Sequence, residues 1–309
     1  MKKNMIVISV AVIILMVILI SFLVGDKEEE YVVTNIQKAI DRAKSGETIK
    51  VPVGTYYENI IIDKPIKLVG EHTRLTVING NNSGSVITIY ADGVTIKGFT
   101  IINSGNHPNA CGIFVNSSDN IIQDNEIKDN DYGIGLWGAT NNKIIDNQVS
   151  NSKWSGIYLA SLSHSNTIKE NTIVGNMSDD NDDDYCINLN GASNNVIQEN
   201  SVSYCYNGIS LINSDENTIS ENNVENNTNG LGITESDDNQ IFKNNFLNNL
   251  HNAYDNSNNA WYEDSLEEGN YWDDYAGNDN DDDGIGDTSY KIDDGTNEDE
   301  YPLMNKVES

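Results

Sequence analysis

An eight-residue pattern, N-x-I-x-x-N-x-apolar, recurs in the middle of this 309-residue chain. Its copies begin at Asn120, Asn142, Asn166, Asn195, Asn217 and Asn239, at intervals of 22, 24, 29, 22 and 22 residues. A second apolar pair, usually introduced by glycine, accompanies each copy. Short apolar runs that alternate with polar residues, separated by Asn, Asp, Ser and Gly, are typical of strands joined by tight turns. The repeat therefore predicts stacked β-strand units.

A repeat of about 22 residues with two or three short strands is one turn of a parallel β-solenoid, in which turns stack about 4.8 Å apart. Equivalent residues then form columns along the stack. Two inward columns are predicted: Ile122, Ile144, Ile168, Ile197, Ile219 and Ile241, and Ile113, Ile134, Ile157, Ile187, Ile209 and Leu231. A hydrogen-bonded amide ladder is predicted for Asn125, Asn147, Asn171, Asn200, Asn222 and Asn244. The one long interval contains an acidic insertion, residues 177–184, which we expect to leave the solenoid as a loop.

Both ends of such a solenoid need a cover. Apolar residues at helical spacing after Thr34 and Asn35 predict a short capping helix, with either residue as N-cap and Gly46 as its end. The repeat fades after Phe246 into an aromatic, Asp-rich tail that we expect to fold over the last turn. The predicted fold is an all-β, right-handed parallel β-helix over residues 31–250, with an acidic C-terminal cap over residues 251–309.

The N-terminus predicts export. Lys2 and Lys3 precede the apolar run Met5–Val24, which is long enough to span a membrane. We interpret residues 1–30 as a signal anchor, with a cleaved signal peptide as the alternative. In either case the positive end stays inside and the remainder lies outside the cell, at its surface or secreted.

The net charge limits which partners the chain can bind, and the cysteine count limits its disulfide bonds. The formal net charge of -30 repels phosphate backbones, so nucleic-acid binding is excluded, whereas divalent cations or a saline habitat are compatible with it. Three cysteines are too few for a disulfide scaffold. Cys186 and Cys205 could bridge neighbouring turns, and the alternative is that both, with Cys111, are buried thiols.

Three portions of the chain carry a family resemblance. They are the opening IQKAIDRAKSGETIKVPVGTYYENIIIDKPIKLVGE, the NxIxxNxI turns, and the ending GNYWDDYAGNDNDDDGIGDTSYKI with DEYPLM. Together they resemble the NosD-like right-handed β-helix proteins of the pectin-lyase-like superfold, with carbohydrate-binding and sugar-hydrolase type repeats, of the archaeal cell-surface type. The resemblance implies the fold, but the superfold hosts lyases, hydrolases, epimerases and binding proteins. The copper role behind the family name is not carried over, because the four histidines are scattered and copper favours His, Met or Cys clusters.

The stretch DNDDDGIGD resembles a calcium loop. Positions 1, 3, 5, 7 and 9 of such loops supply ligands, with glycine at position 6 for the sharp turn. Here the ligands would be Asp279, Asp281, Asp283, the backbone carbonyl of Ile285, and Asp287. Position 12 is Tyr290 rather than an acid, so the loop is not a helix-loop-helix site. We expect a structural calcium ion, and a solvated acidic turn is the alternative.

One outward column suggests a sugar site. Asp131, Trp154, Asp184 and Tyr206 each stand two residues before an apolar pair on successive turns, with Tyr132, Trp137 and Tyr158 nearby. Aromatic rings beside carboxylates suit a sugar, whose C–H face stacks while its hydroxyls form hydrogen bonds. The alternative is that these rings only pack over the solenoid.

Catalysis receives less support from the sequence. A lyase must neutralise a uronate with cationic groups, yet the repeat region contains no arginine and lacks the polygalacturonase-type and epimerase-type motifs. We therefore predict a membrane-anchored surface scaffold or module that binds polysaccharide or envelope components. The alternatives are a polysaccharide lyase or glycoside hydrolase, and an accessory factor in metal-enzyme maturation.

Overall fold

The computed structural model describes residues 33–106, 109–176, 184–263 and 265–308. The apolar run Met5–Val24 and the inserted residues 177–183 lie outside them. Across the described ranges, no helix is long and apolar enough to cross a membrane. Residues 34–309 form one compact unit that contains the described core, so we expect this unit to fold on its own.

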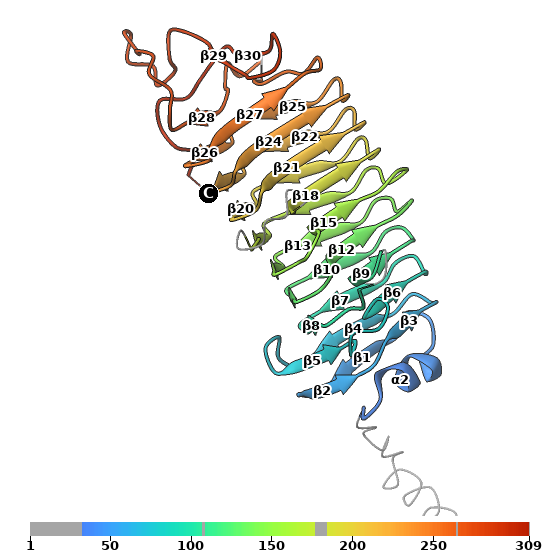
Figure 1. Ribbon diagram of the computed structural model, residues 1–309. Helices are drawn as coiled ribbons and strands as arrows, with labels where there is room; N and C mark the ends of the chain where they lie inside the picture. The colour runs from blue at the N-terminus through green and yellow to red at the C-terminus, as the bar shows by residue number, and fades with distance from the viewer. Residues whose placement is uncertain (1–32, 107–108, 177–183, 264, 309) are drawn as a thin grey trace, which may run out of the picture. The chain divides into compact units, whose positions relative to one another are not determined.

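This unit is the predicted all-β, right-handed parallel β-helix (Figure 1). Each turn contributes one strand to each of three parallel sheets, which we call A, B and C. Sheet A contains β1 (Thr48–Val51), β4 (Lys67–Gly70), β7 (Thr95–Lys97), β10 (Ile121–Gln123), β13 (Lys143–Ile145), β16 (Thr167–Lys169), β19 (Val196–Gln198), β22 (Thr218–Ser220) and β25 (Gln240–Phe242). Sheet B contains β2 (Gly54–Tyr57), β5 (Thr76–Asn79), β8 (Thr100–Ile102), β11 (Glu126–Lys128), β14 (Gln148–Ser150), β17 (Thr172–Val174), β20 (Ser201–Ser203), β23 (Asn223–Glu225), β26 (Asn245–Leu247) and β28 (Tyr271–Trp272). Sheet C contains β3 (Ile60–Ile62), β6 (Ile87–Ile89), β9 (Cys111–Val115), β12 (Tyr132–Leu136), β15 (Ser155–Leu159), β18 (Tyr185–Asn190), β21 (Asn207–Ile212), β24 (Asn229–Thr234) and β27 (His251–Asp255).

The two predicted inward columns are confirmed. Ile122 pairs with Ile144 in sheet A and Ile134 with Ile157 in sheet C, and the same register continues along both sheets. Every residue of both columns is fully buried. Burial of one such side chain stabilises a fold by about 1.5–3 kcal/mol, so the columns supply a large part of the folding free energy.

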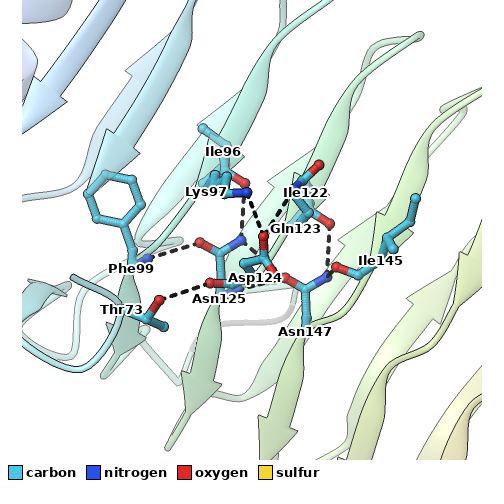
Figure 2. A network of polar contacts seen from close by, with 10 residues as sticks. All are labelled: Thr73, Ile96, Lys97, Phe99, Ile122, Gln123, Asp124, Asn125, Ile145 and Asn147. Atoms are coloured by element: carbon cyan, nitrogen blue, oxygen red, sulfur yellow. Dashed lines mark hydrogen bonds and ion pairs between the residues drawn. The ribbon is translucent and has the colours of Figure 1, made fainter. Parts of the chain in front are cut away.

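The predicted asparagine ladder runs along the corner between sheets A and B. In Figure 2, Asn125 Nδ2 donates to Asn147 Oδ1 at 3.1 Å and to the carbonyl of Ile96 at 3.1 Å. The same side chain accepts from the Phe99 amide at 3.1 Å. The ladder continues through Asn171, Asn200, Asn222 and Asn244 to Asn270, with spacings of 2.9–3.0 Å.

A second ladder, which we did not predict, lies at the corner between sheets C and A. It consists of Asn120, Asn142, Asn166, Asn195, Asn217, Asn239 and Asn259, linked at 2.9–3.2 Å. These are the first asparagines of the sequence pattern. Both asparagines of the repeated pattern therefore have the same role: each satisfies backbone groups where a strand ends at a corner.

The third corner, between sheets B and C, has a broken ladder. From β8 to β26 its equivalent positions, two residues after each strand of sheet B, are Ser104, Asn130, Ser152, Asn176, Cys205, Asn227 and Asn249. Asn227 donates to Asn249 at 3.1 Å, but Ser152 Oγ is buried without a hydrogen-bond partner. Of the two alternatives that the sequence left open for Cys186 and Cys205, the structure has the disulfide, with a Cα–Cα distance of 5.7 Å, and it links this corner to sheet C. Cys111 is a buried free thiol.

Helix α2 (Ile36–Arg42) buries Ile36, Ala39 and Ile40 against the first turn. Asn35 is its N-cap and accepts from the Lys38 amide at 2.7 Å. The predicted end at Gly46 is wrong. Ala43 already has extended backbone angles, and Gly46 (φ 86°) lies in the turn that follows.

At the other end, Trp272 in β28 stacks on Phe246 at 4.4 Å and on Tyr290 at 4.1 Å between ring centroids. Tyr290 belongs to β29 (Tyr290–Lys291), which pairs with β30 (Glu298–Asp299) in a short antiparallel hairpin. The buried carboxylate of Asp299 accepts from Trp272 Nε1 at 2.8 Å. Burial raises the pKa of Asp299 to about 6.

The ladder gives a stability prediction. Replacing Asn171 with Ala leaves the carbonyls of Ile144 and Lys169, and the amide of Asn147, without their side-chain partner. We expect a loss of about 3 kcal/mol in the free energy of unfolding. Each buried polar group left without a partner costs roughly 1–3 kcal/mol, and water can hydrogen-bond to some of the three groups in the variant. Denaturant unfolding of residues 34–309 measures it.

Asn223→Ala is the matched control, since this asparagine faces outward in β23 and lies outside both ladders. We expect a change within about 0.5 kcal/mol, as for ordinary surface substitutions. Equal losses for the two variants would contradict the ladder's role.

Candidate functional site

A polar groove lies at the corner between sheets B and C, where the third ladder is broken. Its volume is about 440 Å³. The lining residues are Asn82, Ser104, Asn106, Asp129, Asn130, Asp131, Asn151 and Lys153. They come from four successive turns, so the groove follows the direction in which the turns stack.

Asp129, Asp131 and Lys153 supply charge inside this groove. The backbone of Asp131 is fixed, because its N–H donates to Ser104 Oγ and its carbonyl accepts from the Trp154 amide, both at 2.9 Å. Burial raises the pKa of the Asp131 carboxyl, and the positive charge of Lys153 opposes that shift. Lys153 Nζ also stands 5.2 Å from the centre of the Trp154 ring, within cation–π range.

The predicted outward column is aligned as expected. The amides of Trp154, Tyr185 and Asn207 donate to the carbonyls of Asp131, Trp154 and Asp184 at 2.9, 3.0 and 2.9 Å. This register places Asp131, Trp154, Asp184 and Tyr206 on successive turns. Only Asp131 of the four lines the groove, and Asp184 is largely buried. A sugar-binding role for the column stays a prediction.

The groove contains residues that sequence reasoning missed. Asp129 and Asn151 both adopt left-handed backbone conformations, with φ of 55° and 50°, and Asn151 Nδ2 donates to Asp129 Oδ1 at 3.2 Å. The signal was available, because both residues directly follow a strand of sheet B by the same offset. Lys153 carried no comparable signal, since no other turn has a lysine at its position.

Part of the predicted calcium loop is assembled. Ligand atoms of Asp279, Asp281 and Asp283 all lie within 4.8 Å of one another. Gly284 has a φ of 90°, as the sharp turn requires, and its amide donates to Asp279 Oδ2 at 3.0 Å.

The other two predicted ligands, Asp287 and the carbonyl of Ile285, stay predictions, and the structure shows other contacts of these two residues. The Asp287 carboxylate accepts from the Asn280 amide at 2.9 Å, and it lies outside the three-carboxylate group. Ile285 donates its amide to Asp283 Oδ1 at 2.8 Å and forms a bridge with Leu303. The bridge to Leu303 connects the loop to the C-terminal tail. The carboxylate oxygens of the loop are hard ligands of the kind that calcium prefers.

The comparisons with known proteins support the fold and a family. The family described as "Periplasmic copper-binding protein (NosD)" matches residues 69–277. No curated protein sequence matches the chain.

Among solved structures, the A-module of mannuronan C-5 epimerase AlgE6 from Azotobacter vinelandii is 18% identical, with 75% of this chain and 76% of that chain covered and a TM-score of 0.53. The AlgE4 A-module from the same organism is 17% identical, with coverages of 71% and 76% and a TM-score of 0.52. Tailspike protein 2 of Escherichia coli O157:H7 bacteriophage CAB120 is 17% identical, with a TM-score of 0.47. The match covers 72% of this chain but only 35% of the tailspike, about a third of its length. At these identities the similarity shows the fold alone.

The described residues do not fit a copper site. Among them, the one group of three or more His, Cys, Asp or Glu side chains gathered closely enough for a metal is Asp279, Asp281 and Asp283. Those carboxylates are hard ligands, whereas copper favours imidazole, thiolate and thioether groups. His72, His164 and His251 are exposed and lie on different turns.

Proposed function

Because the chain belongs to the NosD family, we propose that residues 34–309 work outside the cytoplasm, at the cell surface, as a module that binds carbohydrate or other envelope components without cleaving them. The observation that carries this proposal is the polar groove with Asp131 and Lys153. Its amide, hydroxyl and charged groups are the kinds of groups that orient sugar hydroxyls in binding sites. Anchoring through Met5–Val24 is part of the proposal.

An enzymatic function is the second candidate. Asp131 has a raised pKa beside a lysine, and such groups serve general acid–base catalysis in other proteins. A lyase or hydrolase of the pectin-lyase-like superfold would use them on a bound polysaccharide. Against this, the chain has only two arginines, Arg42 and Arg74, and neither lines the groove. An accessory role in metal-enzyme maturation is a third candidate, which the poor fit to copper weakens.

Calcium binding at the C-terminal cap completes the proposal. Asp279, Asp281 and Asp283 would hold the ion, with the carbonyl of Ile285 and, directly or through water, Asp287. A bound cation would offset the repulsion among these carboxylates and fix the loop against the C-terminal tail. The role is structural, because the loop lies outside the groove.

Calcium should therefore stabilise the isolated unit. When calcium is in about 100-fold excess over its Kd, we expect about 2.7 kcal/mol of added stability. The thermal melt of residues 34–309, with calcium and with a chelator, measures the effect. Asp281→Asn should abolish it, whereas Asp282→Asn, which tests the neighbouring acid outside the group, should keep it. A melt that does not change across millimolar calcium would contradict the site.

The groove should bind polysaccharide through Asp131. We expect Asp131→Asn to weaken binding at least tenfold, because hydrogen bonds to a charged group contribute about 1.5–3 kcal/mol. The measurement is retention of residues 34–309 on a panel of neutral and acidic polysaccharides. Asp119→Asn, at an exposed corner outside the groove, is the matched control and should bind like the wild type.

The same samples should be assayed for new reducing ends and for unsaturated uronates. Binding without either product is the expected result. Products that form with the wild type but not with Asp131→Asn would establish the enzymatic alternative. If the wild type bound none of the polysaccharides, the groove would not have the proposed role.

A further inference from the structure

Five aromatic rings form a continuous cluster on the outer face of sheet C. We call them the aromatic platform: Tyr90, Phe114, Tyr132, Trp137 and Tyr158. Trp137 stacks on Phe114 at 5.0 Å and meets Tyr158 edge-on at 5.2 Å, and Tyr132 lies 5.4 Å from Tyr158. Neither the core nor the groove accounts for this cluster, because the core of these turns is filled by the inward isoleucines.

The position of Trp137 depends on a glycine. A Cβ atom at Gly135 would lie 2.1 Å from Cζ3 of Trp137, so the indole ring rests directly on the backbone of β12. Any other residue at this position would displace the ring. The Trp137 ring is therefore held directly against the backbone of its own strand.

Asn188 lies next to the platform, and no group donates a hydrogen bond to its side-chain oxygen among the described residues. It is the register partner of Tyr158 on the following turn, and both side chains point outward from sheet C. Only 8% of the Asn188 surface is exposed, yet its Oδ1 has no hydrogen-bond partner among the described residues. By contrast, the side-chain oxygens of the asparagines inside the two ladders accept hydrogen bonds. A buried acceptor without a donor is costly, so it points to a hydrogen-bond donor that comes from outside the chain.

We propose that the aromatic platform and Asn188 bind a neutral glycan. The C–H face of a sugar would stack on the rings around Trp137 and Tyr158, and one hydroxyl would donate to Asn188 Oδ1. The platform residues are uncharged, and the net charge of -30 repels uronates and other acidic polymers.

This inference rests on the proposed function and specifies its ligand class. Tyr132 of the platform directly follows Asp131 of the groove in the chain, so one glycan could extend from the groove onto sheet C. Binding would then depend little on salt, because stacking and hydroxyl hydrogen bonds carry no net charge.

The test compares a soluble neutral β-glucan with polygalacturonate by isothermal titration calorimetry on residues 34–309, at low and high salt. We expect the glucan to bind and polygalacturonate not to bind. Trp137→Ala and Asn188→Leu should each weaken glucan binding at least tenfold, and Trp137→Phe should restore part of the loss. Tyr254→Ala is the matched control, because Tyr254 covers Gly232 on the same sheet away from the platform.

Asn188→Leu also separates binding from folding. It removes a buried polar group without a partner, so its melting temperature should equal or exceed that of the wild type while binding falls. Glucan binding that is lost in Asp131→Asn but unchanged in Trp137→Ala and Asn188→Leu would overturn the platform and leave the groove function intact. Binding of polygalacturonate alone would overturn the neutral ligand class, and no binding of any glycan would overturn both proposals.

Discussion

The asparagine ladders are the interaction on which the rest of this structure depends. At each corner the chain leaves one sheet and enters the next, and the backbone groups there have no strand partner. At two of the three corners a buried asparagine satisfies them, and its Nδ2 also donates to the equivalent asparagine of the next turn. Any shift in register would break a complete row of these bonds. The interval of about 22 residues is therefore a physical constraint.

The site lies where this constraint is relaxed. Two corners have ladders without a break from Asn120 to Asn259 and from Asn125 to Asn270, but the third changes among serine, asparagine and cysteine. The groove opens at that third corner around Ser104 and Asn130, and the Cys186–Cys205 disulfide joins the same corner further along. Two complete ladders hold the frame rigid, and the third corner is free to present Asp131 and Lys153. A rigid frame with one variable corner suits recognition, since binding then requires little ordering of the protein.

The sequence was sufficient to predict those features whose residues recur at fixed positions in every repeat. Ile144 and Asn147 recur at fixed offsets, so their columns and the first ladder followed from spacing alone, as did the alignment of Asp131 with Trp154. The first asparagine of each repeat has an equally regular spacing, and the second ladder could have been predicted from it. What could not be predicted depends on features that occur once. Lys153 has no counterpart on other turns, and Trp137 folds back over Gly135 in a way that no periodicity encodes. The end of helix α2 was misplaced because Gly46 serves the following turn.

The central claim is that a ladder-built frame holds an intact neutral glycan across the groove and sheet C. A crystal structure of residues 34–309 with a neutral gluco-oligosaccharide tests it most directly. The account predicts an uncleaved sugar stacked near Trp137, with a hydroxyl within hydrogen-bond distance of Asn188 Oδ1 and unchanged ladders beneath it. A cleaved sugar beside Asp131, or an intact sugar bound to another face of the solenoid, would contradict it.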